Sequence, residues 1–148
     1  MLELGTGTGL LGIFAALKLQ QLNRSNYRIV LTDLEKPSLD ITDENVALNG
    51  LPASQVSTEY FRWGEHAEET GVEKDFGGKA REYDLILGSD VIYSNLAALP
   101  FAKSVGYLLS DSGTAIVAND TIRYTNYEET FQNELEKNGL EIVKKDTL

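Results

Sequence analysis

The sequence of 148 residues contains no cysteine, and it has one histidine, one tryptophan and three prolines. Without cysteine there is no disulfide framework, no thiol nucleophile and no cysteine-based zinc site. A single histidine argues against a histidine-rich metal site, so we expect no metal. Apolar runs stay well short of the roughly 20 residues that a membrane-spanning helix needs. We also find no signal peptide, and we therefore expect a cytoplasmic or nuclear protein without a membrane partner.

Basic residues are also scarce, with 13 lysines and arginines against 23 aspartates and glutamates, which gives a formal net charge of −10. Nucleic-acid binding requires a basic surface, so we expect no nucleic-acid partner. The negative charge suits a basic partner or a positively charged cofactor, although solubility alone also explains it. The apolar content of 42% and the length are those of one ordinary globular domain.

Patterns typical of strands and of helices alternate along the chain. This alternation predicts an α/β fold with a mostly parallel sheet. The predicted strands cover residues 1–4, 27–33, 56–61, 83–90 and 113–120, and a last strand begins at 140. The predicted helices cover residues 9–22, 37–50, 96–109 and 126–139, with a kink or break at Pro100.

The pattern is interrupted at both ends of the chain. The first predicted strand has almost no length before Gly5, and the chain stops soon after the last predicted strand begins. We therefore expect a single domain over residues 1–148 that is incomplete at its N- and C-termini. The polar segment 64–82, which includes His66, is predicted to be an exposed loop.

Three glycines at every second position, Gly5, Gly7 and Gly9, follow the first predicted strand. Glycine permits a tight turn and lets a ligand approach the main chain, and the helix that follows offers backbone amides. Ligands of open α/β sheets bind at this end of the strands. The spacing differs from the G-x-G-x-x-G of dinucleotide sites, and Glu3 would repel a pyrophosphate but attract an ammonium group. A tight strand-to-helix connection without a ligand is the alternative.

An acidic residue also ends the second predicted strand, in the stretch LTDLE. Asp33 lies 24 residues after Gly9, close to the spacing of the carboxylate that binds ribose hydroxyls in related folds. The alternative is an aspartate that caps the next helix. Together, Glu3, the glycines and Asp33 describe a ligand with a ribose and a cationic amine but no phosphate. S-adenosyl-L-methionine fits this description.

The stretches LELGTGTGLLGI, LTDLEK, RWGE and YDLILGSDVIYSNL, in this order, resemble the seven-β-strand protein-lysine methyltransferases of the methyltransferase-like group. Members of this group modify the valosin-containing ATPase, Hsp70 chaperones or translation elongation factors. The resemblance covers nearly the whole chain and implies a Rossmann-like, doubly wound sheet with helices on both faces. It also implies S-adenosyl-L-methionine as cofactor, S-adenosyl-L-homocysteine as product and a protein substrate with a target lysine. It leaves the oligomeric state open.

The resemblance also assigns cofactor-binding roles. It places the methionine part and the ribose among five residues of the glycine turn: Glu3, Gly5, Thr6, Gly7 and Gly9. Asp33 would hold the ribose hydroxyls, Leu34 would lie beside the adenine, Trp63 along its edge, and Ser89 would flank the cofactor. For Trp63, a place in the core is the alternative, because the lone tryptophan of a small domain is often buried.

Asp90 and Tyr93 match the Asp/Glu-x-x-Tyr element that the resemblance places at the substrate mouth. Asp90 would orient the lysine amine and accept its proton, and Tyr93 would line the lysine channel. The alternatives are a helix cap for Asp90 and a packed ring for Tyr93.

Two other functions compete with methylation of a protein lysine. A small-molecule N-methyltransferase would use the same scaffold, and an incomplete domain could bind a cofactor or partner without turnover. A nicotinamide-dependent oxidoreductase is disfavoured by the glycine spacing.

Overall fold

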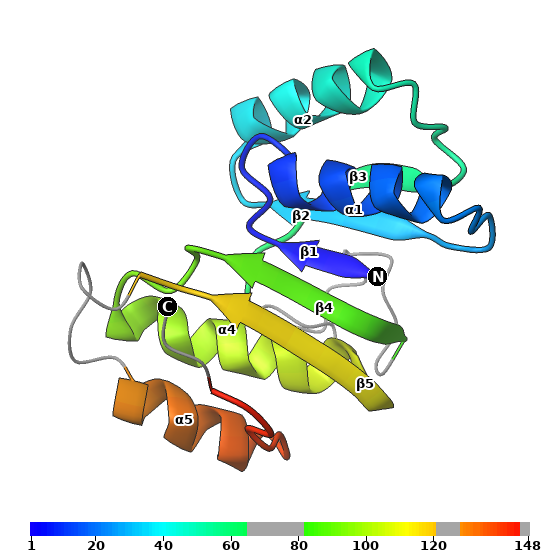
Figure 1. The fold of residues 1–148 in the computed structure, drawn as a ribbon. Helices are drawn as coiled ribbons and strands as arrows, with labels where there is room; N and C mark the ends of the chain where they lie inside the picture. Colours follow the sequence, from blue (N-terminus) through cyan, green and yellow to red (C-terminus); the bar gives the residue numbers. More distant parts are fainter. Residues whose placement is uncertain (65–81, 121–127, 146–148) are drawn as a thin grey trace.

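The computed structural model describes residues 1–64, 82–120 and 128–145. Within them, five parallel strands form one sheet in the order β3-β2-β1-β4-β5 (Figure 1). The strands are β1 (Leu2–Leu4), β2 (Ile29–Asp33), β3 (Val56–Tyr60), β4 (Tyr83–Ser89) and β5 (Leu109–Ala118). The helices are α1 (Leu10–Gln21), α2 (Lys36–Leu48), α4 (Asn95–Leu108) and α5 (Glu128–Lys137). The predicted α/β fold with a parallel sheet is confirmed.

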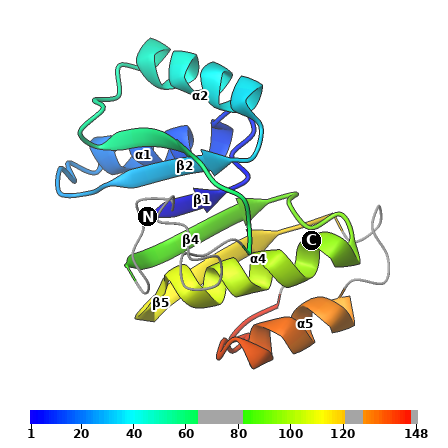
Figure 2. The same ribbon diagram turned by 180° about the vertical axis from the view of Figure 1, so that it is seen from behind.

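Alternating side chains of the central strands point to opposite faces of the sheet. Leu2, Leu4 and Val30 are fully buried in a cluster with α4, whereas Ile29 and Leu31 are fully buried in a second cluster with α1 and α2. Because successive strand residues face opposite sides, this pattern places α1 and α2 on one face and α4 on the other. Figure 2 shows α4 and α5 together on the side away from α1. The predicted doubly wound arrangement is therefore confirmed.

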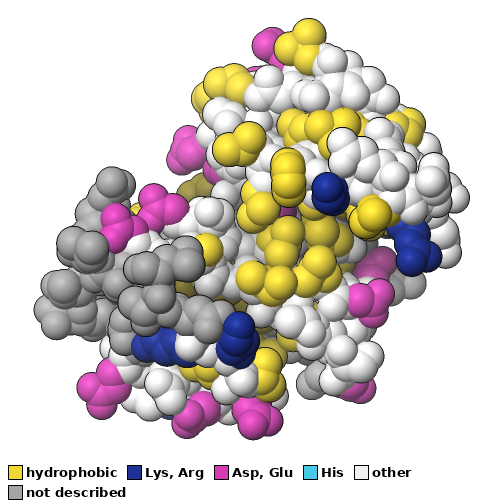
Figure 3. All heavy atoms as spheres, in the orientation of Figure 1, with side chains coloured by type: hydrophobic (Ala, Val, Ile, Leu, Met, Phe, Trp, Pro, Cys, Tyr) yellow, Lys and Arg dark blue, Asp and Glu magenta, His cyan; other side chains and the backbone are white. Residues whose placement is uncertain are grey.

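The face that carries α1 and α2 is covered over β1, β2 and β3 but not over β5 in the described part of the chain. Ala115 and Val117 of β5 pack against the α4 cluster, so Ile116 between them points to the other face, where it is 56% exposed. Phe14 of α1 is 62% exposed. Figure 3 shows hydrophobic side chains gathered on this face. Parallel sheets normally bury both faces, whereas Ile116 leaves part of this face exposed among the described residues.

Most predicted elements are found. Two expectations differ from the structure: the break at Pro100 and the first residue of β5. Helix α4 is not broken at Pro100, because Ala98, Phe101 and Val105 are buried and hold it against the sheet. Strand β5 begins at Leu109, directly after α4, rather than at Gly113. Its first residues pair irregularly with β4, and Ser110 Oγ donates to Asp84 Oδ1 over 3.2 Å.

The strand predicted to begin at residue 140 is wrong for residues 140–145, the part that the structure describes. The Leu140 amide instead donates to the carbonyl of Leu135 and closes the end of α5, with Gly139 at φ 75°. This is a Schellman-type ending, which uses the amide that a strand would need. The predicted loop at 64–82, with His66, lies outside the described residues except at its ends. None of the described helices is long and apolar enough to cross a membrane.

Candidate active site

The ends of β1 and β2 are joined by the glycine turn. The amides of Gly5 and Thr6 both donate to the carbonyl of Thr32, over 2.9 and 2.8 Å. Gly5, Gly7 and Gly9 have φ values of 74°, 58° and 86°, which glycine adopts without the strain that other residues incur. The turn is therefore a tight strand-to-helix connection, as the ligand-free alternative requires. It also leaves room for a ligand, since a Cβ added at Gly7 would meet nothing within 4 Å.

Asp33 links the end of β2 to this turn. Its Oδ2 accepts from the Gly7 amide over 2.9 Å, and its Oδ1 accepts from the Glu35 amide over 2.9 Å. Glu35, not Asp33, is the N-cap residue of α2, so the helix-cap alternative is wrong. Each carboxylate oxygen has further acceptor capacity. Leu34, the next residue in the chain, has an apolar side chain that is 41% exposed.

Helix α2 holds the turn from the other side. The Thr42 hydroxyl donates to the Gly7 carbonyl over 2.9 Å, and Asn45 Nδ2 donates to the Thr8 carbonyl over 2.8 Å. Thr42 is fully buried and also contacts the turn at Gly9, where an added Cβ would lie 2.8 Å from Thr42 Cγ2. Sequence reasoning missed both residues, because they lie inside a helix and nothing in the sequence pairs them with the turn.

Glu3 lies beneath the turn and is 2% exposed. Its Oε2 accepts from Thr6 Oγ1 and from the Gly12 amide, each over 2.9 Å. Burial raises the pKa of Glu3, and these two hydrogen bonds oppose the rise. Glu3 therefore ties β1, the turn and the first turn of α1 together. Its predicted contact with a ligand stays a prediction.

Trp63 lies beside the turn at Gly5. A Cβ added at Gly5 would lie 3.1 Å from Trp63 Cζ2 and 2.8 Å from Val91 Cγ1. The indole also packs edge-on against Phe101, with ring centroids 5.1 Å apart. The adjacent Gly64 amide donates to the buried Ser104 hydroxyl of α4 over 2.9 Å. Trp63 thus both joins the core and borders the glycine turn.

The loop after β4 lies beside the glycine turn, because β4 is paired with β1 in the sheet. Ser89 and Asp90 are exposed, and Tyr93 is 57% exposed, whereas Val91 is buried against Gly5. The N-cap of α4 is Ser94, whose hydroxyl accepts from the Ala97 amide over 3.3 Å. The alternative of a helix cap for Asp90 is therefore wrong, whereas Tyr93 is more exposed than a ring packed in the core.

A family model described as lysine methyltransferase matches residues 1–138 of the chain. The chain belongs to this lysine methyltransferase family. It is 33% identical over 118 residues to protein N-lysine methyltransferase METTL21A of Mus musculus, covering 78% of this chain and 47% of the relative. It is 31% identical over 146 residues to protein-lysine N-methyltransferase EFM2 of Saccharomyces cerevisiae, covering 97% of this chain and 33% of the relative.

The fold of this chain is also similar to that of solved methyltransferases. The ribosomal protein L11 methylase from Lactobacillus delbrueckii subsp. bulgaricus superposes with a TM-score of 0.67 and 22% identity, over 99% of this chain and 63% of that one. This likeness confirms the Rossmann-like methyltransferase fold. The chain spans about half the length of the mouse relative and a third of the yeast one.

Within this methyltransferase fold, the predicted residues divide into two neighbouring groups. In the group around the turn, hydrogen bonds join Gly7 to Asp33, and Gly5 and Thr6 to Thr32. The group at the end of β4 and in the loop after it, Ser89 to Tyr93, touches the first where Val91 meets Gly5. Among the described residues, no group of three or more histidine, cysteine, aspartate or glutamate side chains could hold a metal ion.

Proposed function

We propose that this chain carries the catalytic domain of an S-adenosyl-L-methionine-dependent methyltransferase that modifies a lysine side chain of a protein. The observation that carries the proposal is the contact between the glycine turn and the loop after β4, at Gly5 and Val91. A cofactor on the turn and a substrate amine at Asp90 would thereby be neighbours. Alignment of two reactants in this way is a large part of catalysis of a group transfer.

The turn fits the cofactor that the proposal requires. Gly7 has open space where a side chain would be, so a ligand can reach the backbone there. Asp33 retains acceptor capacity for ribose hydroxyls, and the exposed Leu34 offers an apolar surface for an adenine ring. When bound, the cofactor supplies a methyl group on a positively charged sulfur. The proposal gives Gly5, Thr6, Gly7 and Asp33 the task of holding it.

Asp90 and Tyr93 act on the substrate in this proposal. A lysine must lose its proton to attack, yet its ordinary pKa is about 10.4. A carboxylate alone would favour the charged lysine, so the proposal does not use Asp90 to lower the lysine pKa. Asp90 instead orients the amine through a hydrogen bond and accepts its proton at a carboxylate oxygen. The exposed Tyr93 ring contacts the alkyl chain and the cationic head.

The proposal is tested by incubating the chain with cell lysate and tritium-methyl-labelled S-adenosyl-L-methionine. We expect label in a protein band, recovered as methyllysine after acid hydrolysis. Asp90→Asn removes an acceptor charge and lowers the rate of labelling by about tenfold or more. Label that enters only small molecules would indicate a small-molecule N-methyltransferase, and binding of S-adenosyl-L-homocysteine without any transfer would indicate a binding module.

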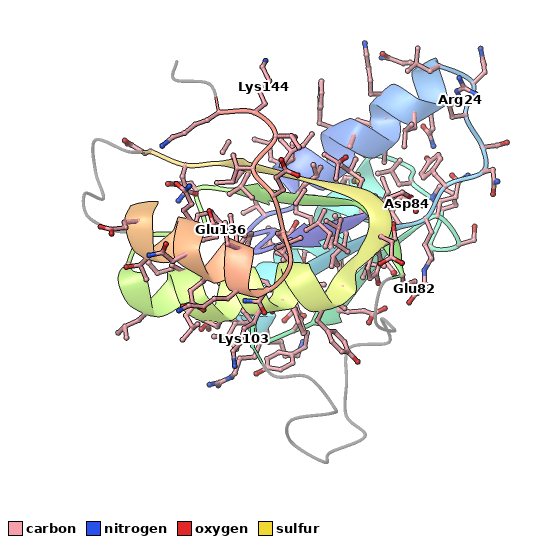
Figure 4. The ribbon with its side chains drawn as sticks, turned by 90° about the horizontal axis from the view of Figure 1, so that it is seen from below. Arg24, Glu82, Asp84, Lys103, Glu136 and Lys144 are labelled. Carbon is pink, nitrogen blue, oxygen red and sulfur yellow. The ribbon has the colours of Figure 1, made fainter. Side chains whose placement is uncertain are left out.

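Asp84→Asn is the matched control for Asp90→Asn. Asp84 is also an exposed aspartate of the β4 region, and Figure 4 shows it with Glu82 near the amino end of the strand. Its Oδ1 accepts from Ser110, and it lies at the opposite end of β4 from Asp90, so it has no place in the proposed reaction. Equal losses of labelling in the two variants would contradict the role of Asp90.

A further inference from the structure

The loop from Asp90 to Tyr93 buries its two middle residues and exposes the two outer ones. Asp90 and Tyr93 are exposed, whereas Val91 and Ile92 are only 4% and 1% exposed. The two inner residues therefore fix the loop to the core, and the two outer residues are presented to solvent. The backbone polar groups of Val91 and Ile92 need partners, because unpaired buried groups are costly.

Asn119, the residue that follows β5, supplies these partners. Its Oδ1 accepts from the amides of Val91 and Ile92 over 3.1 and 3.4 Å. Its Nδ2 donates to the carbonyl of Ile92 over 2.7 Å. One side chain thus makes three hydrogen bonds to two consecutive residues of the loop. These contacts join segments 27 and 28 residues apart in the sequence.

The loop needs such support because of its backbone at Asp90. Asp90 has φ 54°, in the left-handed region that non-glycine residues seldom occupy. Its amide donates to the carbonyl of Ala118 over 2.7 Å, which extends the pairing of β4 with β5 by one residue. A conformation of this kind persists only where surrounding contacts hold it. Ala118 and Asn119 provide those contacts side by side.

We propose that Asn119 is a positioning residue that sets the places of Asp90 and Tyr93 by clamping the backbone between them. This inference rests on the proposed function for the roles of those two side chains. It does not require Asn119 to touch substrate or cofactor. The side chains that act on the substrate are then fixed by β5, while the cofactor is held by β1, β2 and α2.

Asn119→Ala removes all three hydrogen bonds and tests the clamp directly. We expect the amides of Val91 and Ile92 to exchange with deuterium faster than in the unchanged chain. In the lysate assay at saturating cofactor, we expect the rate of labelling to fall by about tenfold or more, because small displacements of reacting groups are that costly. The KM for S-adenosyl-L-methionine and the calorimetric Kd for S-adenosyl-L-homocysteine should not change.

Asn138→Ala is the matched control. Asn138 is half-buried at the end of α5, where its Nδ2 donates to the carbonyl of Glu134 over 2.7 Å and its Cβ and carbonyl oxygen pack against Gly106. It should lower thermal stability without changing exchange at Val91 and Ile92 or the labelling rate per folded molecule. A labelling rate that falls equally in both variants, or a Kd that weakens together with the rate in Asn119→Ala, would overturn the positioning role.

The two proposals fail in different ways. If the unchanged chain labels no protein, the proposed function fails, and the exchange measurement still decides whether Asn119 clamps the loop. If the unchanged chain labels protein but Val91 and Ile92 exchange at the same rate in Asn119→Ala, the clamp is refuted while the proposed function stands.

Discussion

The glycine turn after β1 and the loop after β4 lie side by side but differ in the contacts that hold them. The turn is surrounded by contacts from three elements: Glu3 below, Asp33 from β2, and Thr42 and Asn45 from α2. The loop has buried side chains underneath and one clamping residue, Asn119, at its side. The difference matches the two tasks proposed here.

A cofactor is the same molecule in every catalytic cycle, so a turn held by contacts from several elements suits it. A protein substrate brings its own surface, and the loop after β4 therefore exposes Asp90 and Tyr93 and buries only Val91 and Ile92. If this account is correct, changes in the turn should act on cofactor affinity and stability, and changes in the loop should act on turnover.

The largest expected effect comes from Gly5, where the two regions touch. In Gly5→Ala the new Cβ would lie 2.8 Å from Val91 Cγ1 and would sit on a backbone with φ 74°. We expect unfolding free energy to fall by about 2–4 kcal/mol from overpacking and backbone strain. Urea denaturation measures this loss, and S-adenosyl-L-homocysteine affinity and labelling should fall together.

Comparison with Gly7→Ala separates the cost of backbone strain from the cost of the contact with Val91. Gly7 has φ 58°, but its Cβ would meet nothing within 4 Å, so only the backbone strain of about 1 kcal/mol remains. Equal losses of stability in the two variants would show that the contact between Gly5 and Val91 is unimportant, and the two regions would have to be treated as independent.

The next largest expected effect distinguishes the role of Asp33 from that of Asp90. Asp33→Asn removes an acceptor from the turn, and we expect calorimetry to show S-adenosyl-L-homocysteine binding weaker by about tenfold, as for the loss of a hydrogen bond to a charged group. Asp90→Asn should leave that affinity unchanged and lower only the labelling rate. Each variant is the control for the other. Weaker binding in Asp90→Asn would mean that the loop also holds cofactor.

The sequence was sufficient to locate both regions, for a physical reason. The three glycines of the turn lie within five neighbouring residues, and their spacing predicts a tight connection directly. Asp33 could be placed beside them because parallel strands end at the same edge of a sheet. The Asp/Glu-x-x-Tyr element, which the family resemblance assigned to Asp90 and Tyr93, likewise lies within four neighbouring residues.

The residues that hold the two regions could not be found in this way. Thr42 and Asn45 bond the turn across 35 and 37 residues, and Asn119 bonds the loop across 27 and 28. Such pairings depend on where α2 and β5 pack, and no local pattern reports that. The wrong last strand has a similar cause, since the bond from Leu140 to Leu135 closes α5 and takes the amide that a strand would use.

The smallest effect concerns Glu3, which the turn holds buried. Burial raises the pKa of Glu3 above its ordinary value of 4.5. The folded chain therefore binds this proton more tightly than the unfolded chain does. Its contribution to unfolding free energy is greatest below pH 4.5, declines as the pH rises through the raised pKa, and is constant above it. Glu3→Gln keeps an acceptor oxygen for Thr6 and Gly12 but cannot ionise.

The difference in unfolding free energy between Glu3→Gln and the unchanged chain isolates this one group, because every other carboxylate titrates in both proteins. Urea denaturation at a series of pH values from 4 to 8 gives that difference. We expect it to shift in favour of Glu3→Gln as the pH rises, and then to level off. A difference that does not vary with pH would mean that the turn holds the Glu3 charge without cost. A shift in the opposite direction would mean that the hydrogen bonds from Thr6 and Gly12 outweigh burial, and that the turn itself is a site tuned for negative charge.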